Sequence, residues 1–80
     1  MRVRAKTLQL LITFSSTVQA MSMETQAHAA GLPGRLIPAP TSITAGCGLA
    51  YRAPLDSRTE LLALIQRAGL EPEQVVEMLL

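Results

Sequence analysis

The sequence has few of the residues on which many protein functions depend. It contains one cysteine, Cys47, and only two aromatic side chains, Phe14 and Tyr51. A single cysteine excludes a disulfide within the chain and a zinc site built from several cysteines, and it fits a reducing compartment. So few aromatic side chains cannot provide a stacking surface for nucleic-acid bases.

Net charge and long apolar segments are equally scarce. The formal net charge is +1, which is too small to hold nucleic acid through bulk electrostatics. No apolar run approaches the roughly 20 residues that a helix needs to span a bilayer. We therefore expect a cytoplasmic protein that has neither nucleic acid nor a membrane as its partner.

The N-terminus has some features of a signal peptide. Three basic residues precede a short apolar stretch at 8–14, as in the charged start and apolar centre of such a peptide. Gln9 interrupts that stretch, which leads directly into a helix-start signal and has the character of a strand. We therefore expect residues 1–7 to form a basic, solvated tail and residues 8–80 to form one small domain.

Strand and helix signals alternate along this domain. Residues 8–14 have the length and the nearly continuous apolar character of a central strand. Ser16 to Gln19 match a capping box at the start of a helix, and Gly31 is expected to end that helix. Small and apolar residues at spacings of three and four predict its buried stripe, which consists of Ala20, Met23, Ala27 and Ala30.

Two short strands and a second helix follow. Residues 34–38 and 48–53 have strand character, and proline ends each of them. Residues 57–60 match a second capping box, and Gly69 is expected to close the second helix with a Schellman turn. Residues 71–80 could form a helix or a strand, and we favour the strand because it would complete the sheet.

This order of elements predicts the fold class. Strand, helix, strand, strand, helix and strand make an α+β, ferredoxin-like β-α-β-β-α-β sandwich, with an antiparallel sheet and both helices on one face. The other face of the sheet would stay open. Because the hydrophobic content is 49%, we expect apolar surface that is hidden against a partner or a second copy.

The surroundings of Cys47 are the most informative feature of the chain. A glycine lies on each side of it, Gly46 and Gly48, at the end of a loop of small residues. A thiol that only fills a core is normally placed among bulky apolar side chains. Here the glycines leave the sulfur uncrowded, which favours a reactive cysteine. A buried cysteine in a glycine bend is the alternative interpretation.

Sulfur chemistry at Cys47 would require its thiolate, which accepts a sulfur or selenium atom and passes it to the next thiol. We expect three features to stabilise that thiolate. These are an anion-binding nest of amides at 45–48, positive charge from Arg35 and Arg52, and a hydroxyl of Ser42 or Thr44. Solvated strand charges and ordinary turn residues are the simpler interpretations of these side chains.

The other polar residues do not form a catalytic or metal-binding set. His28 is interpreted as an exposed residue of the first helix, and Glu71, Glu73 and Glu77 as a solvated face rather than a paired acid and base. The sequence therefore predicts no metal site and no cofactor. It favours a carrier protein over an enzyme.

Two sequence blocks then point to a family. Residues 35–40 are RLIPAP and residues 47–52 are CGLAYR, after a first strand that ends in Phe14-Ser15-Ser16-Thr17. Together, over about residues 8 to 78, they resemble the Se/S carrier-like domain, a small bacterial family named for a proposed role in selenium or sulfur handling.

Three positions depart from the pattern of that family. Ser15 stands where a larger polar residue, often histidine, is usual, so we do not expect an acid–base role there. Gly46 replaces serine or another small residue, which loosens the loop. Tyr51 replaces an aliphatic residue.

The resemblance implies a chalcogen carrier with no cofactor of its own. Cys47 would accept a persulfide or selenosulfide from a donor such as a cysteine desulfurase or a selenium-metabolism protein, in company with TusA-like sulfur carriers. The alternative is a non-catalytic interaction module, in which Cys47 is structural and the open sheet face docks a partner or forms a homodimer. A thiol redox sensor that crosslinks through Cys47 is a third hypothesis.

Overall fold

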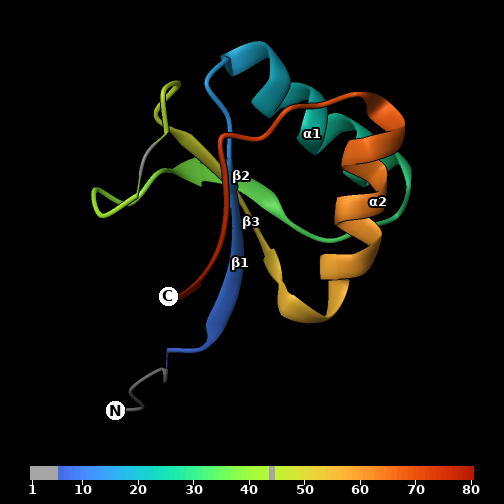
Figure 1. Ribbon diagram of the computed structural model, residues 1–80. Coiled ribbons are helices and arrows are strands. Elements are labelled where there is room, and N and C mark those ends of the chain that lie inside the picture. Colours follow the sequence, from blue (N-terminus) through green and yellow to red (C-terminus); the bar gives the residue numbers. More distant parts are fainter. Residues whose placement is uncertain (1–5, 44) are drawn as a thin grey trace.

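A four-stranded sheet and two helices make up the protein (Figure 1). The computed structural model describes residues 6–43 and 45–80, so most of the predicted basic tail and Thr44 lie outside the described residues. The elements are, in chain order, β1 (Leu8–Thr13), α1 (Thr17–Ala29), β2 (Arg35–Pro38), β3 (Leu49–Pro54), the 3₁₀ turn η1 (Leu55–Ser57), α2 (Arg58–Ala68) and β4 (Gln74–Leu79).

The strands form one antiparallel sheet in the order β2-β3-β1-β4. The most apolar strand, β1, lies inside the sheet, where Leu11 pairs with Arg52 of β3 and with Val76 of β4. The predicted α+β class with an antiparallel sheet is confirmed. The strand favoured for the C-terminal segment is confirmed as well, since β4 pairs with β1 along its whole length.

Both helices lie on the same face of the sheet (Figure 1). Alternate residues of β1, Leu10 and Ile12, face this layer and join Met23 of α1 and Leu61 of α2 in one buried core. Tyr51 of β3 belongs to the same core. The alternation of strand side chains therefore separates a covered face from an open one.

The start of α1 differs in part from the predicted capping box. The side chain of Ser16 accepts a hydrogen bond from the amide of Gln19 at 3.4 Å, as expected. Gln19 does not return this bond, because its Oε1 accepts the amide of Glu71 at 2.9 Å. The helix ends before Gly31 as predicted, but Ala30 is exposed at the C-cap rather than part of the buried stripe.

The prediction of a capping box at α2 was wrong. Ser57 lies in η1, and its side chain makes no cap hydrogen bond. Since η1 leads directly into α2, the backbone of Ser57 (φ −96°, ψ 5°) lacks the extended form that a capping side chain usually needs. The other end of α2 is as predicted, because the amide of Leu70 donates to the carbonyl of Ile65 at 3.0 Å in a Schellman arrangement around Gly69.

The face of the sheet away from the helices has no helix over it (Figure 1). Leu11 and Thr13 of β1 point to this face, with Ala50 of β3 and Val76 of β4 among their neighbours. Leu11 and Thr13 are nevertheless fully buried, and the hydroxyl of Thr13 has no hydrogen-bond partner among the described residues. Among the described residues, neither helix is long and apolar enough to cross a membrane.

Candidate functional site

Cys47 lies in a turn beside the junction between β1 and α1. Its backbone N–H donates to the carbonyl of Phe14 at 3.3 Å, and Phe14 comes shortly before Ser16, the residue that caps α1. The amide of Gly48 donates to the carbonyl of Ala45 at 2.9 Å, which closes the turn. The cysteine is thus held at the end of the central strand, at the point where the first helix starts.

The side chain of Cys47 is partly buried at the edge of the core and is a free thiol. Its Sγ lies 3.7 Å from the carbonyl oxygen of Leu49, to which the thiol can donate a weak hydrogen bond. The structure therefore supports neither a fully sealed core cysteine nor a fully solvated one. Part of the residue is open to solvent, and part packs against the core.

Glu73 ties the cysteine turn to the sheet. Its Oε1 accepts the amide of Gly46 at 2.8 Å, and its own amide donates to the carbonyl of Thr13 at 2.6 Å. The sequence interpretation of Glu73 as a solvated residue is right about its exposure, but it misses this contact. The signal that could have found it is the pairing of β4 with β1, which brings the residue before β4 to the end of β1.

The two glycines beside Cys47 have different structural roles. A Cβ atom at Gly46 would lie 3.1 Å from the Cα of Ser15, so the close approach of the turn to the β1–α1 junction favours the absence of a side chain. Gly48 has φ +78°, a left-handed conformation that other residues rarely adopt. Both glycines therefore shape the turn that presents the thiol.

The predicted anion nest at 45–48 is not free to form in this conformation. The amides of Gly46, Cys47 and Gly48 each already donate to an acceptor within the protein. Because a nest needs convergent amides without other acceptors, these three cannot also surround the sulfur. The structure shows how Gly46 and Gly48 shape the turn. Their contact with a substrate stays a prediction.

Arg35 and Arg52 come together in the structure, but not at Cys47. They lie directly opposite each other on β2 and β3, and both are exposed. Arg52 pairs with Leu11, three positions before Phe14, which is about 10 Å along a strand. Since Phe14 binds the backbone of Cys47, the paired arginines occupy a separate part of the sheet, and their role in substrate binding stays a prediction.

The loop between β2 and β3 projects from the sheet (Figure 1), and Ser42 belongs to it. The amide of Ile43 donates to the carbonyl of Pro40 at 3.2 Å and closes a turn around it. In the described part of the chain, the hydroxyl of Ser42 makes no hydrogen bond to Cys47. The alternative donor, Thr44, lies outside the described residues.

Tyr51 belongs to the core rather than to the candidate site. Its hydroxyl donates to the carbonyl of Pro33 at 2.8 Å. Burial of the phenol, and then the nearby carboxylate of Glu24, raise the pKa of Tyr51 to about 12. The ring lies where a Cβ atom at Gly34 would be, so the larger side chain fits because position 34 is a glycine.

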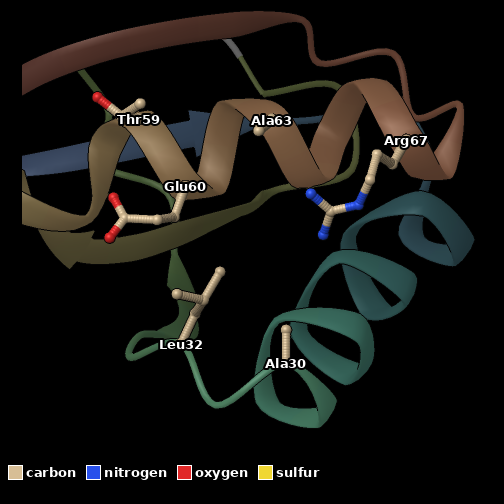
Figure 2. A pocket seen from close by; sticks show the side chains of 6 residues that line it. All are labelled: Ala30, Leu32, Thr59, Glu60, Ala63 and Arg67. Atoms are coloured by element: carbon tan, nitrogen blue, oxygen red, sulfur yellow. The ribbon is translucent and has the colours of Figure 1, made fainter.

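A groove of about 340 Å³ lies between the two helices, on the layer that covers the sheet (Figure 2). Figure 2 shows Arg67 near one end of it, Glu60 near the other, and Leu32 and Ala30 on the side of α1. It contains no thiol. Within residues 6–43 and 45–80, no three side chains of His, Cys, Asp or Glu gather closely enough to hold a metal ion.

Comparison with known proteins supplies the family. Residues 9–77 match the family described as "Putative Se/S carrier protein-like". The matched region includes the β1–α1 junction, the cysteine turn and Glu73. Neither a curated protein nor a solved structure matches the chain. Because the family match extends over nearly all of the described residues, the chain belongs to the Putative Se/S carrier protein-like family.

Proposed function

We propose that the protein carries sulfur or selenium on Cys47, as a persulfide or selenosulfide, in the cytoplasm. The description of its family supports a chalcogen carrier. The observation that carries the proposal is the position of Cys47, a free and partly exposed thiol in a turn that is fixed to the end of β1. A cysteine held in this way can meet a donor protein without unfolding of the core.

The transfer is a thiol exchange and needs no cofactor. The Cys47 thiolate attacks the outer sulfur or selenium atom of the donor's persulfide or selenosulfide. The bond from that atom to the donor cysteine breaks, the donor leaves as a thiolate, and a new bond to Cys47 forms. An acceptor thiolate then repeats the step on the loaded Cys47. Each exchange leaves the total oxidation state unchanged, so no oxidant or reductant is consumed.

The hydrogen bonds around the turn prepare Cys47 for this exchange. The bond from Cys47 to Phe14 and the bond from Gly46 to Glu73 hold the backbone at two successive residues. Fixing the backbone in advance reduces the entropy that is lost when a partner docks on the thiol. Glu73 is therefore a positioning residue for Cys47 and does not itself take part in the exchange.

The partners that we propose are those that the family resemblance implies. The donor would be a cysteine desulfurase or a selenium-metabolism protein, and a TusA-like sulfur carrier would be a neighbour in the same relay. The element order β-α-β-β-α-β supports a ferredoxin-like assignment for the fold. A single cysteine, which must stay reduced to work, fits the cytoplasm.

The test is loading of the intact protein by a cysteine desulfurase and cysteine, followed by mass spectrometry. The wild type should gain the mass of one sulfur atom, and a thiol reductant should remove it. Cys47→Ser should fold normally, because the side chain is small and only partly buried, and it should gain nothing. Equal loading of the serine variant would refute the proposal.

One observation favours the alternative, an interaction module with a structural cysteine. On the sheet face opposite the helices, Val76 and Met78 of β4 are partly exposed apolar side chains, and this face could dock a partner or a second copy. This alternative predicts that Cys47 resists alkylation until the protein unfolds and that a dimer is seen by sedimentation. The partial exposure of Cys47 is the reason that we place the carrier first.

A further inference from the structure

Arg35 and Arg52 form a basic pair on the sheet face opposite the helices. They are direct partners in the register of β2 and β3, so their Cβ atoms lie about 5 Å apart on one face. Both side chains are exposed. We propose that this pair binds a small tetrahedral oxyanion, such as phosphate or sulfate, at a site separate from Cys47.

A cavity of about 250 Å³ lies at the pair. Both arginines line it, and Gln9, Gly34 and Pro54 form other parts of its wall. None of its lining residues is acidic. The cavity therefore places two positive charges at one recess that has no acidic side chain in its wall, and such an arrangement attracts an anion.

Among the residues that the structure describes, neither arginine has an acidic partner in an ion pair. The ion pair found in the described part of the chain joins Arg58 to Glu77 at 3.2 Å. Neither Arg35 nor Arg52 takes part in it. Glu24, which lies near β2, accepts the amide of Leu36 at 2.9 Å with its Oε2. The charges of Arg35 and Arg52 are thus left for a ligand from outside the chain.

The direct pairing of like charges also has an energetic cost. Two cations opposite each other on adjacent antiparallel strands repel, and such pairs destabilise a sheet. A bound anion between the guanidinium groups would convert this repulsion into two attractions. Folding and anion binding should therefore be coupled, and the coupling is measurable as thermal stabilisation.

The geometry favours a tetrahedral anion over a carboxylate. Each guanidinium presents a planar fork of N–H donors that matches a pair of oxygen atoms. A carboxylate can face one fork with its two oxygens. A phosphate or sulfate has oxygen atoms on several sides, so it can accept hydrogen bonds from both forks when they approach from adjacent strands.

The experiment measures the thermal unfolding midpoint of the full chain in phosphate, sulfate, acetate and chloride at equal ionic strength and pH. The wild-type midpoint should rise in phosphate and sulfate above its value in chloride and acetate. Arg35→Gln and Arg52→Gln should each lose most of this rise. The matched control is Arg67→Gln, which removes the same charge from α2 and should keep the rise.

A second measurement locates the anion. Titration with phosphate should shift the backbone amide resonances of residues 34–36 and 51–53, and should leave those of α2 unchanged. In chloride, the glutamine variants should unfold at or above the wild-type temperature, because the repulsion is relieved. No rise specific to phosphate and sulfate, an equal rise in acetate, or an undiminished rise in Arg35→Gln and Arg52→Gln would each overturn the proposal.

This inference does not rest on the proposed carrier function. Cys47→Ser, which abolishes loading if that function is right, should keep the full response to phosphate. A wild-type protein that loads sulfur normally but shows no rise of its unfolding midpoint in phosphate would refute the anion site alone. Failure of loading with a normal phosphate response would refute the carrier alone.

Discussion

Cys47 and Glu73 illustrate how single side chains define the candidate site. Cys47 is fixed by backbone hydrogen bonds and flanking glycines rather than by dense packing around its sulfur. Glu73, which lies 27 positions after Gly46 in the chain, accepts a hydrogen bond from the amide of Gly46 and so holds the turn in place. The conformation of the Cys47 turn therefore depends on a carboxylate that is distant in the sequence.

Glu73→Ala should loosen the cysteine turn. Loss of the hydrogen bond to Gly46 costs about 1 kcal/mol, so the amide hydrogen of Gly46 should exchange about fivefold faster. Sulfur loading of Cys47 should slow as well, since the turn is less often in its bound position. Hydrogen exchange by NMR and the initial rate of loading are the measurements.

Glu73→Gln is the matched control for this change. Its amide oxygen can still accept the bond from Gly46, so exchange and loading should stay close to those of the wild type. If the alanine and glutamine variants load sulfur equally slowly, the negative charge rather than the hydrogen bond is what matters, and the positioning role is wrong.

The raised pKa of Tyr51 predicts that the protein loses stability at high pH. The pKa of Tyr51 is raised to about 12 in the folded protein, while in the unfolded chain it is about 10. Between these values the unfolded chain loses the phenol proton and the folded protein keeps it, so the stability present below pH 10 falls as pH rises to about 12. The full effect is about 2–3 kcal/mol.

Tyr51→Phe isolates this effect. The variant should be about 1 kcal/mol less stable at neutral pH, because the hydrogen bond to Pro33 is lost. Its free energy of unfolding should then decline less steeply than that of the wild type above pH 10. Urea unfolding at several pH values measures both terms, and parallel pH profiles for the two proteins would contradict the raised pKa.

Among the secondary-structure elements, β1 contacts two other strands and the layer of helices. It lies between β3 and β4, and one of its faces packs on both helices. The same strand ends at the cysteine turn and leads into α1. Its opposite face contains the buried hydroxyl of Thr13, which has no hydrogen-bond partner in the described structure.

Thr13→Val should stabilise the protein by about 1 kcal/mol. The substitution keeps the size and branching of the side chain and removes a hydroxyl whose burial is not compensated by a hydrogen bond. The midpoint of urea unfolding should increase with an unchanged dependence on urea concentration. A less stable variant would mean that the hydroxyl has a partner such as bound water.

Across the whole molecule, the parts that could be predicted from sequence are those with local signals. Ser16 and Gly31 bound α1 correctly, because caps depend on neighbouring residues in the chain. Other features depend on the register between segments that are distant in the sequence. These are the hydrogen bond between Glu73 and Gly46 and the cross-strand pairing of Arg35 with Arg52. Register is set by packing of the whole sheet, so the residue pattern of one strand could not reveal it.

The wrong prediction at Ser57 has the same origin. The motif of a capping box was present, but the chain after β3 tightens into a 3₁₀ turn before α2. That turn belongs to the connection between β3 and α2, and the motif alone contains no information about it. The sequence drew attention to Cys47 because its glycine neighbours are a local signal, and the reactivity of its thiol stays a prediction.

The most direct measurement follows a chalcogen atom into and out of the protein. The protein is loaded with labelled sulfur, separated from the donor, and mixed with an excess of an acceptor thiol protein, and both chains are weighed by mass spectrometry. A carrier predicts that the label leaves Cys47 and appears on the acceptor in equal amount. Label that stays on Cys47, or that is never gained although the native thiol can be alkylated, would contradict it.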